Sequence, residues 1–422
     1  MKGYSVIILG FGTAATSAIV ALRDAGYEGR LLVIDKGCGL PYSPVLTSYY
    51  AAGLIERDDC FLWDGQDIER YGVDVVYGVE VVSLNAAAHE IAVSDGRVFS
   101  YGKCLIATGA SPTLSVNDDM RACNPLVLRD MDDADRFASV LQRGDGLRLL
   151  VSGTSMVALK SVEACLERGA HATLLGRSPH ILRGNAHPAC AARFETWLAA
   201  LGVDMRLSDS VEAASAQEGA CEVTFASDGA TERYDGVLVA HGVRPNIGFV
   251  GEGTLVVDRG VVVDGEMRTS DPDVFAAGDV AQASDIATGG TRVFGLWMTA
   301  RQQGATAGFA IAAALGCCGH RGFEERLFGG GLMCNTIHVH DIVFASAGTV
   351  TCEEGGSLEV EELSDDALLV RAYAPVGQQQ RALVGFNVVA HADERGLYPA
   401  VLDEIGIMRS EIERVCLSGQ ES

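Results

Sequence analysis

Short apolar runs that lead into glycine and then into a helical pattern start near the N-terminus. Residues 4–9 are almost entirely apolar, Gly10 and Gly12 follow, and residues 14–25 are small and helical in their pattern. Residues 31–34 form the next apolar run. Strands buried inside parallel sheets have such continuous apolar runs, and glycine permits the turn from strand to helix. The pattern predicts a strand–helix–strand unit.

The same pattern returns in the middle of the chain. It predicts a strand over residues 148–151, a turn over 152–155, a helix over 156–168 and a second strand over 171–175. Because the order of elements is the same, the chain contains an internal repeat of architecture.

Three more apolar runs end in a glycine turn, and after them the pattern changes. From about residue 327 the helical periodicity weakens, and short β-rich runs at 367–373 and 382–388 precede an expected helix near 398–404. We expect a separate α+β domain there, in an otherwise α/β chain. The three apolar runs are residues 105–110, 237–242 and 274–280.

The composition narrows the class of protein. Of the 422 residues, 48% are hydrophobic and 21% charged, which is ordinary for a protein with a large core. The formal net charge is −24, so we expect neither nucleic acid nor an anionic membrane surface as a partner. No apolar run approaches the length of a membrane span, and the N-terminal run fits a first strand better than a signal peptide. These observations predict a cytoplasmic protein without a membrane span.

The cysteines and histidines predict no metal site. The twelve cysteines contain no C-x-x-C pair, so we expect no zinc or iron–sulfur centre and mostly reduced, buried thiols. His338 and His340 alternate as on one face of a strand, but no third ligand stands near them. We expect them to be packed or surface residues.

The first glycine turn has the pattern of a dinucleotide-binding site. Gly10, Gly12 and Ala15 form G-x-G-x-x-A directly after a strand and at the start of a helix. The glycines allow a tight turn and a close approach of backbone to a pyrophosphate, and the helix N-terminus offers N–H donors to phosphate. Asp35 ends the next strand, where a carboxylate accepts from ribose hydroxyls.

Over residues 3–325 the chain resembles flavoproteins with two dinucleotide-binding domains: pyridine nucleotide–disulfide oxidoreductases, and in particular the ferredoxin- and rubredoxin-reductase-like branch. The most specific match is residues 269–281, which in that family place an aspartate, here Asp279, near the ribityl chain and phosphates of FAD. Residues 296–304 resemble the helix under the flavin ring. The resemblance implies that FAD binds Gly10, Gly12, Thr13, Ala15, Asp35, Lys36, Val81, Ala107, Thr108, Gly109, Gly278, Asp279 and Trp297.

The resemblance also implies a domain plan. It predicts an α/β fold of two Rossmann-like units, one for FAD and one for NAD(P), with the second inserted in the first, plus a small C-terminal α+β domain. The FAD domain is expected over residues 1–118 and 248–325, the NAD(P)H domain over 119–247, and the interface domain over 326–422.

The second glycine turn departs from the family pattern. Ser155 stands where the second glycine is expected, so a working NAD(P)H site and a vestigial one are both open readings. Gly176 stands where NADH-using members place glutamate and Arg177 follows, which favours NADPH slightly. His241, beside the next glycine, is a further candidate for contact with the nicotinamide region. The residues assigned to NAD(P)H are Gly153, Ser155, Met156, Arg177 and Gly242.

Lys160 is the predicted catalytic residue. In family members a glutamate at this position often pairs with a lysine beside flavin N5, and Ser48 stands near the place of that lysine here. A cation near the flavin would stabilise its reduced anionic form. The alternative is a lysine on a surface helix.

The resemblance predicts an FAD-dependent NAD(P)H oxidoreductase that passes electrons to an external acceptor. We expect an iron–sulfur protein or the iron–sulfur subunits of a larger complex, and a homodimer or a subunit of such a complex. One alternative is a disulfide or peroxide reductase that uses Cys38, whose Cys-Gly-Leu-Pro-Tyr context resembles single-cysteine members but lies too close to Asp35. The other is a flavin electron-transfer subunit with a vestigial NAD site.

Overall fold

The computed structural model describes residues 2–317, 327–350, 356–364, 366–376, 380–391, 405–408 and 410. These residues form two compact units. Unit 1 contains residues 1–45, 57–111 and 243–332, and unit 2 contains 46–56, 112–242 and 333–422. The three-domain plan stays a prediction, because the two units group the chain differently. The helix expected at 398–404 lies outside the described residues.

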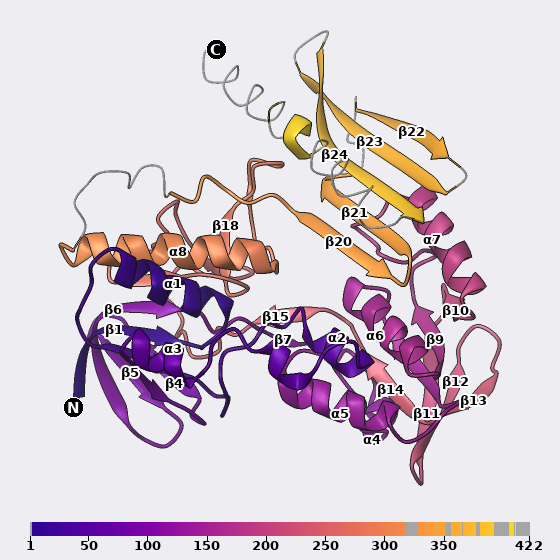
Figure 1. Cartoon of the computed structure of the whole chain (residues 1–422), viewed down its shortest axis with the longest axis horizontal. Coiled ribbons are helices and arrows are strands. Elements are labelled where there is room, and N and C mark those ends of the chain that lie inside the picture. Colours follow the sequence, from indigo (N-terminus) through magenta and orange to yellow (C-terminus); the bar gives the residue numbers. More distant parts are fainter. Residues whose placement is uncertain are drawn as a thin grey trace. The chain divides into compact units, whose positions relative to one another are not determined.

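Unit 1 is built on a mostly parallel sheet of strand order β3-β2-β1-β6-β5-β4, in which β17 also pairs with β6 (Figure 1). β1, β2, β3, β6 and β17 are parallel, while β4 and β5 form antiparallel pairs. The strands are β1 (Lys2–Leu9), β2 (Leu31–Ile34), β3 (Val73–Val76), β4 (Val81–Asn85), β5 (Glu90–Val93), β6 (Val98–Ile106) and β17 (Val274–Ala276).

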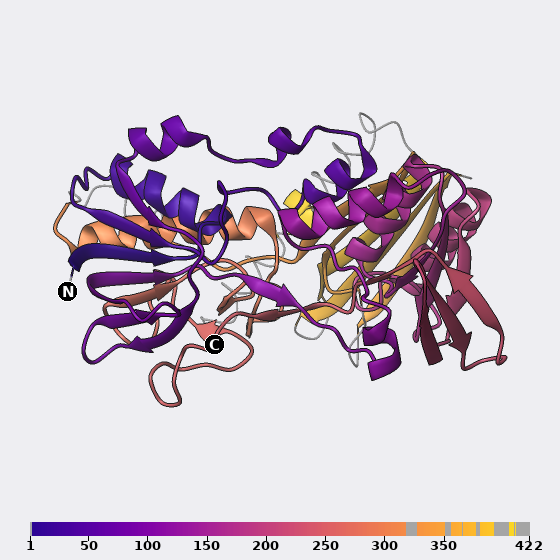
Figure 2. The same cartoon turned by 90° about the horizontal axis from the view of Figure 1, so that it is seen from below.

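Two helices of unit 1 pack closely, with glycines of one against the backbone of the other. α1 (Thr13–Asp24) and α8 (Trp297–Ala314) lie side by side in Figures 1 and 2. A Cβ at Gly304 would overlap the carbonyl oxygen of Ala14, and one at Gly308 would overlap that of Ala18. The glycines of α8 therefore set the distance between the helices.

The remaining short elements lie in unit 1 or where the chain passes from one unit into the other. They are α3 (Gly65–Arg70), the 3-10 helix η1 (Arg57–Cys60), β7 (Ala110–Pro112), β15 (Val243–Pro245), β16 (Val261–Val262), β18 (Ala281–Ser284) and β19 (Thr291–Arg292).

Unit 2 repeats the parallel arrangement in smaller form. Its four-stranded sheet has the order β10-β9-β8-β14, and a three-stranded sheet of order β11-β12-β13 stands beside it. The strands are β8 (Arg148–Ser152), β9 (His171–Gly176), β10 (Asp204–Leu207), β14 (Gly236–Val239), β11 (Val211–Gln217), β12 (Ala220–Phe225) and β13 (Thr231–Tyr234). The helices are α2 (Thr47–Ala52), α4 (Asp118–Ala122), α5 (Met131–Leu141), α6 (Met156–Glu167) and α7 (Pro188–Ala200).

The C-terminal part of unit 2 is a five-stranded antiparallel sheet of order β20-β21-β24-β23-β22. Helices α6 and α7 contact this sheet. Its apolar residues, such as Phe344, belong to the same buried cluster as Phe194 of α7. The strands are β20 (Cys334–Val339), β21 (Ile342–Gly348), β22 (Ser357–Ser364), β23 (Ala367–Val376) and β24 (Gln380–His391).

The cysteines hold one feature that the sequence did not reveal. Most described cysteines are free, as expected, but Cys123 and Cys221 form a disulfide within unit 2. Among the described residues, no helix is both long and apolar enough to span a bilayer.

We expect Gly304→Ala to lower the thermal stability of the protein. The added methyl group overlaps the Ala14 carbonyl, and overpacking of this kind costs about 1–3 kcal/mol. At an open helical position alanine would instead stabilise by roughly 0.5–1 kcal/mol relative to glycine. Gly65→Ala in α3 is the matched control, because nothing lies within 4 Å of its added Cβ. Thermal unfolding of both variants should therefore give shifts of opposite sign, and equal shifts would refute the close packing.

Candidate functional site

The turn from β1 into α1 leaves a helix N-terminus open. Gly10 has a φ of 93°, and a Cβ there would overlap the carbonyl oxygen of Ala107. Gly12 is the N-cap residue of α1, and no side chain caps the helix. The first N–H groups of a helix lack partners within it, so this end is suited to a phosphate.

Asp35 follows β2 beside this turn. Its Oδ1 accepts from the N–H of Phe11 at 3.3 Å, and its Oδ2 accepts from the N–H of Gly37 at 3.1 Å. Burial raises the pKa of Asp35, while these N–H groups act in the opposite direction. The carboxylate lines a cavity of about 550 Å³ together with other residues expected at the FAD site: Gly10, Lys36, Val81 and Thr108.

Among the described residues, the buried polar atoms of unit 1 without a hydrogen-bond partner include Thr13 Oγ1, Trp297 Nε1 and Gln303 Nε2. Buried polar atoms are rarely left unpaired in proteins. Thr13 begins α1, and Trp297 begins α8. A bound cofactor with many polar atoms, such as FAD, would supply partners, so these residues fit that group.

The remaining expected FAD residues gather at the same edge of the sheet. The N–H of Gly278 donates to Gln303 Oε1 at 2.8 Å, and a Cβ at Gly278 would lie 3.2 Å from the Ala14 Cβ. Gly278 therefore contacts the first turn of α1, and Asp279 is the next residue along the chain. Ala15 is fully buried in α1, where its small side chain suits the packing of helix on strand.

The two crossover segments expected from the resemblance are joined by hydrogen bonds. Thr108 Oγ1 donates to the Asn246 carbonyl at 2.8 Å, and Asn246 Nδ2 donates to the Thr108 carbonyl at 2.9 Å. The N–H of Asn246 also donates to the Gly109 carbonyl at 2.9 Å.

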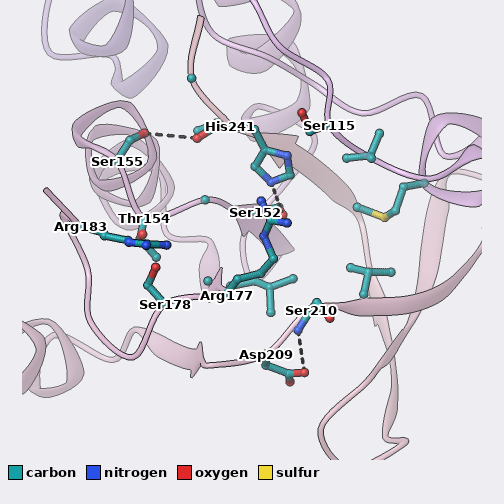
Figure 3. A pocket seen from close by; sticks show the side chains of 18 of the residues that line it. Ser115, Ser152, Thr154, Ser155, Arg177, Ser178, Arg183, Asp209, Ser210 and His241 are labelled. Carbon is teal, nitrogen blue, oxygen red and sulfur yellow. Dashed lines mark hydrogen bonds between the residues drawn. The ribbon is translucent and has the colours of Figure 1, made fainter.

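Unit 2 has a second cavity, of about 790 Å³, at the ends of β8, β9 and β14 (Figure 3). Gly153 turns the chain there with a φ of 126°, and its Cβ would overlap the Ala240 carbonyl. Of the residues predicted for NAD(P)H, Gly153, Ser155, Arg177 and Gly242 line this cavity. Met156 instead packs against the apolar core of the unit.

Ser155 caps helix α6 with its own side chain. Its Oγ accepts from the N–H of Ala158 and donates to the Ala240 carbonyl, both at 3.4 Å. The serine that replaces the expected glycine thus occupies one of the donors that a pyrophosphate would use. The other first-turn N–H groups keep no side-chain cap.

Two arginines of the cavity have no carboxylate partner among the described residues. Arg177 and Arg183 are both exposed and point into the cavity region, with Ser178 nearby (Figure 3). A Cβ at Gly176 would overlap the Thr154 side chain, so an acidic residue could not stand at the end of β9 unless Thr154 moved.

His241 and Asp209 complete the polar lining. His241 Nε2 lies 2.9 Å from Ser152 Oγ, and burial lowers the pKa of His241, which keeps the imidazole neutral near pH 7. Burial would raise the pKa of Asp209, but hydrogen bonds from Ser227 and Ser210 outweigh it and lower the pKa. The Asp209 carboxylate is therefore already stabilised by the protein.

Lys160 lies elsewhere in unit 2, within a network of its own. Its Nζ pairs with Glu163, lies 3.3 Å from the His338 carbonyl oxygen and stands 4.1 Å from the centre of the Tyr49 ring. Only 12% of the Lys160 side chain and 3% of the Glu163 side chain are exposed.

The two histidines of the H-x-H pattern take part in separate contacts. His338 Nε2 lies 3.3 Å from the Tyr49 hydroxyl, and His340 Nδ1 lies 3.4 Å from a Glu167 carboxylate oxygen. In the part of the chain that the structure describes, no group of three His, Cys, Asp or Glu residues could hold a metal ion.

Sequence reasoning missed several residues of both sites. Gln303 lies within the segment that resembles the helix under the flavin, yet no rule about residue type marked it. Arg183 follows in an irregular segment, so no strand-end rule could find it. Other cavity-lining residues that were missed include Ser115, Asn117, Met120, Ser152, Thr154, Ser178, Asp209 and Ser210.

Comparison with known proteins matches most of the chain. A family described as "Pyridine nucleotide-disulphide oxidoreductase" matches residues 4–304. The chain is 28% identical over 352 residues to the epsilon subunit of an NADH-dependent phenylglyoxylate dehydrogenase from Aromatoleum evansii, covering 83% of this chain and 81% of the subunit. It is 26% identical over 283 residues to a rubredoxin-NAD(+) reductase from Pseudomonas putida, covering 67% of this chain and 73% of that one.

Solved structures share the fold. The covalent putidaredoxin reductase–putidaredoxin complex matches with a TM-score of 0.80 and 21% identity, covering 100% of both chains. An engineered water-forming NADPH oxidase bound to NADPH, derived from an oxidase of Lactobacillus brevis, matches with a TM-score of 0.81 and 18% identity, covering 96% of this chain and 91% of that one.

We expect Asp35→Asn to weaken FAD binding by about 10- to 100-fold, since hydrogen bonds to a charged group contribute about 1.5–3 kcal/mol. The amide keeps the size of the side chain but loses the charge that accepts from ribose hydroxyls. The measurement is FAD affinity after reconstitution of the apoprotein. Asp95→Asn, which changes an exposed aspartate paired with Arg97, is the control and should bind FAD as the wild type does. Wild-type affinity in Asp35→Asn would exclude Asp35 from the site.

Proposed function

The chain belongs to the pyridine nucleotide–disulphide oxidoreductase family and is an FAD-dependent NAD(P)H oxidoreductase, and from this we propose that it transfers electrons from NADPH to an iron–sulfur protein. The acceptor is either a small iron–sulfur protein or the iron–sulfur subunits of a larger complex. We also propose a cytoplasmic location and either a homodimer or a place in that complex.

The observation that carries the proposal is the pair of nucleotide-type cavities. Each lies where a strand turns through a glycine into a helix, and each glycine leaves no room for a Cβ. The first cavity has an acid at the next strand end, and the second has two arginines. Because these charged groups are opposite in sign, two different dinucleotides fit the two cavities better than two copies of one dinucleotide would.

Each residue has a binding role in this proposal. Asp35 accepts from the ribose of FAD, the first turn of α1 donates to its phosphates, and Asp279 meets the ribityl region. In unit 2, the turn at Gly153 and the N-terminus of α6 receive the pyrophosphate of the nicotinamide cofactor. When bound, FAD supplies the chemistry of hydride acceptance and onward electron transfer, while the protein binds and orients it.

The acceptor class is supported by the place of Cys38 and by the relatives. Cys38 is an exposed free cysteine, and its Sγ lies 3.5 Å from a Cβ placed at Gly78, next to the lining residue Val79 at the Asp35 end of the cavity. This position favours a place for Cys38 near the adenosine end of FAD and away from its flavin ring. Relatives named as a rubredoxin reductase and a dehydrogenase subunit support an external protein acceptor.

The choice of NADPH rests on the end of β9. The absence of a side chain at Gly176 removes the carboxylate that would repel a 2′-phosphate, and Arg177, Ser178 and Arg183 offer donors to one. The engineered NADPH oxidase replaces an aspartate with alanine, the next residues with arginine and serine, and a proline five positions further on with arginine. Gly176, Arg177, Ser178 and Arg183 have the same order and spacing.

We expect Arg177→Gln and Arg183→Gln each to lower kcat/KM for NADPH by about 10- to 100-fold, because each loses a charge-assisted contact to phosphate. The kcat/KM for NADH should change by less than about twofold in both variants. Stopped-flow reduction of the flavin by each nucleotide gives both numbers. Arg143→Gln, an exposed arginine of unit 2 outside the cavity, is the matched control. Equal losses with both nucleotides would reject a 2′-phosphate site, and no reduction by either would favour a vestigial one.

We further propose that Lys160 tunes the flavin, as its position in the family pattern implies. In unit 2 its charge is balanced by Glu163, one helical turn away, so the two side chains act together. The electrostatic effect on a flavin is that of the pair rather than of a lone cation.

The Lys160–Glu163 pair predicts shifts of the flavin midpoint potential that have opposite signs for its two members. Lys160→Met should lower the flavin midpoint potential and Glu163→Gln should raise it, each by roughly 30–60 mV, which corresponds to about 1.4–2.8 kcal/mol for a two-electron couple. Spectroelectrochemical titration of the holoenzyme measures both. Shifts of the same sign, or none, would assign Lys160 a purely structural role in its helix.

A further inference from the structure

We propose that Cys123 and Cys221 are a redox modification site, whose disulfide holds one wall of the unit 2 cavity in place and whose reduction by a dithiol weakens nucleotide binding. The proposal rests on the proposed function only for the identity of the bound nucleotide.

The two cysteines are distant in sequence and adjacent in the fold. Cys123 is the C-cap residue of α4, and Cys221 lies in β12, 98 positions later. Their Cα atoms are 5.7 Å apart, within the range of protein disulfides. The backbone thus brings the pair to bonding distance without help from a flexible loop.

Helix α4 forms part of the cavity wall. Asn117 and Met120 line the cavity, and Asn117 Oδ1 accepts from the N–H of Met120 at 2.9 Å to cap the helix. Met120 is 1% exposed and belongs to the same apolar cluster as Cys221. Because α4 has five residues, its position depends on these contacts and not on its own helical stability.

The disulfide connects this wall to the neighbouring β11–β12–β13 sheet, whose strand β11 packs against α4. Cys221 pairs with Ala216 of β11 and with Tyr234 of β13, so β12 is the central strand of its sheet. β11 begins at Val211, which lines the cavity beside Ser210. One covalent bond therefore joins the α4 side of the cavity to the sheet that carries the Val211 side.

The exposure of the two sulfur-bearing residues sets the order of reduction. Cys123 is half-buried, whereas Cys221 is 2% exposed. A thiolate of the reducing dithiol attacks Cys123 Sγ, and Cys221 leaves as a thiolate. The second thiol of the reductant then attacks the mixed disulfide and releases Cys123. The reductant becomes a disulfide, and the two protein sulfurs take up two protons as two thiols.

In a reducing compartment such a bond is transient, which suits a sensor. Under oxidising conditions α4 is fixed and the cavity is pre-formed. After reduction α4 is held by noncovalent contacts alone, so binding must order it again, and affinity falls.

The test uses the intact flavoprotein, oxidised or treated with dithiothreitol. Peptide mapping after alkylation should show Cys123 linked to Cys221 before treatment and both alkylated afterwards. Calorimetric titration with NADP⁺ and with NAD⁺ should show about fivefold weaker binding of the preferred nucleotide after reduction. Cys123→Ser and Cys221→Ser should bind as the reduced protein does in both conditions. Cys38→Ser, which removes an exposed free thiol of unit 1, should behave as the wild type does.

Hydrogen exchange of residues 115–123 supplies a readout that needs no nucleotide. Exchange should rise on reduction in the wild type and be high in both cysteine variants in either condition. Alkylation of both cysteines before reduction, equal affinities in the two states, or unchanged exchange would each overturn the proposal. If neither nucleotide binds in either state while exchange still rises, the proposed function fails and the disulfide remains the clamp of this wall.

Discussion

Both cavities depend on one backbone constraint. The chain leaves a buried parallel strand and enters a helix within three residues, next to the end of a neighbouring strand. In unit 1 Leu9 is opposite Ile106, so Gly10 meets the carbonyl of the next residue, Ala107. In unit 2 Ser152 is opposite Val239, and Gly153 meets the carbonyl of Ala240. Any side chain at either glycine would push apart the strands that position the helix N-terminus, so the cavities exist only where this contact is kept.

The two glycine turns differ in the charged groups that stand beside them. The residue after β2 is Asp35, and the residue that closes β9 is Gly176, at equivalent registers relative to the preceding glycine turn. Unit 1 therefore offers a carboxylate and an uncapped helix, whereas unit 2 offers guanidinium groups and a helix that Ser155 already caps. A cap that fills one donor weakens the helix as an anion site, and arginines at the rim offset that loss for a ligand with an additional phosphate. The divergence is consistent with one site for a flavin nucleotide and another for a phosphorylated nicotinamide nucleotide.

The sequence predicted the features that depend on residues close together along the chain. The spans of β1, α1, β8, α6 and β9 agree with the expected ones within a residue or two, because strand and helix periodicities are short-range signals. Asp35 and Arg177 could be predicted because a strand end fixes the position of the residue that follows, and each lines a cavity. Gln303, Arg183 and the Cys123–Cys221 pair were not found, because only the tertiary fold brings them to their sites. The same holds for residues 46–56, which belong to unit 2 by their contacts although no local pattern separates them from unit 1.

The network around Lys160 shows how a reversed charge is tolerated. A lysine that is 12% exposed needs a partner, since an isolated buried charge is costly. The family pattern implies a glutamate here and a lysine near Ser48; instead the partner, Glu163, comes from the same helix, and Tyr49, next to Ser48, receives the cation on its ring. Where the family pattern implies an ion pair between two segments, this chain has a pair within one helix plus a cation–π contact. Because opposite charges one turn apart produce a field that falls off faster than that of a single charge, the Lys160–Glu163 pair would act on another group only at short range.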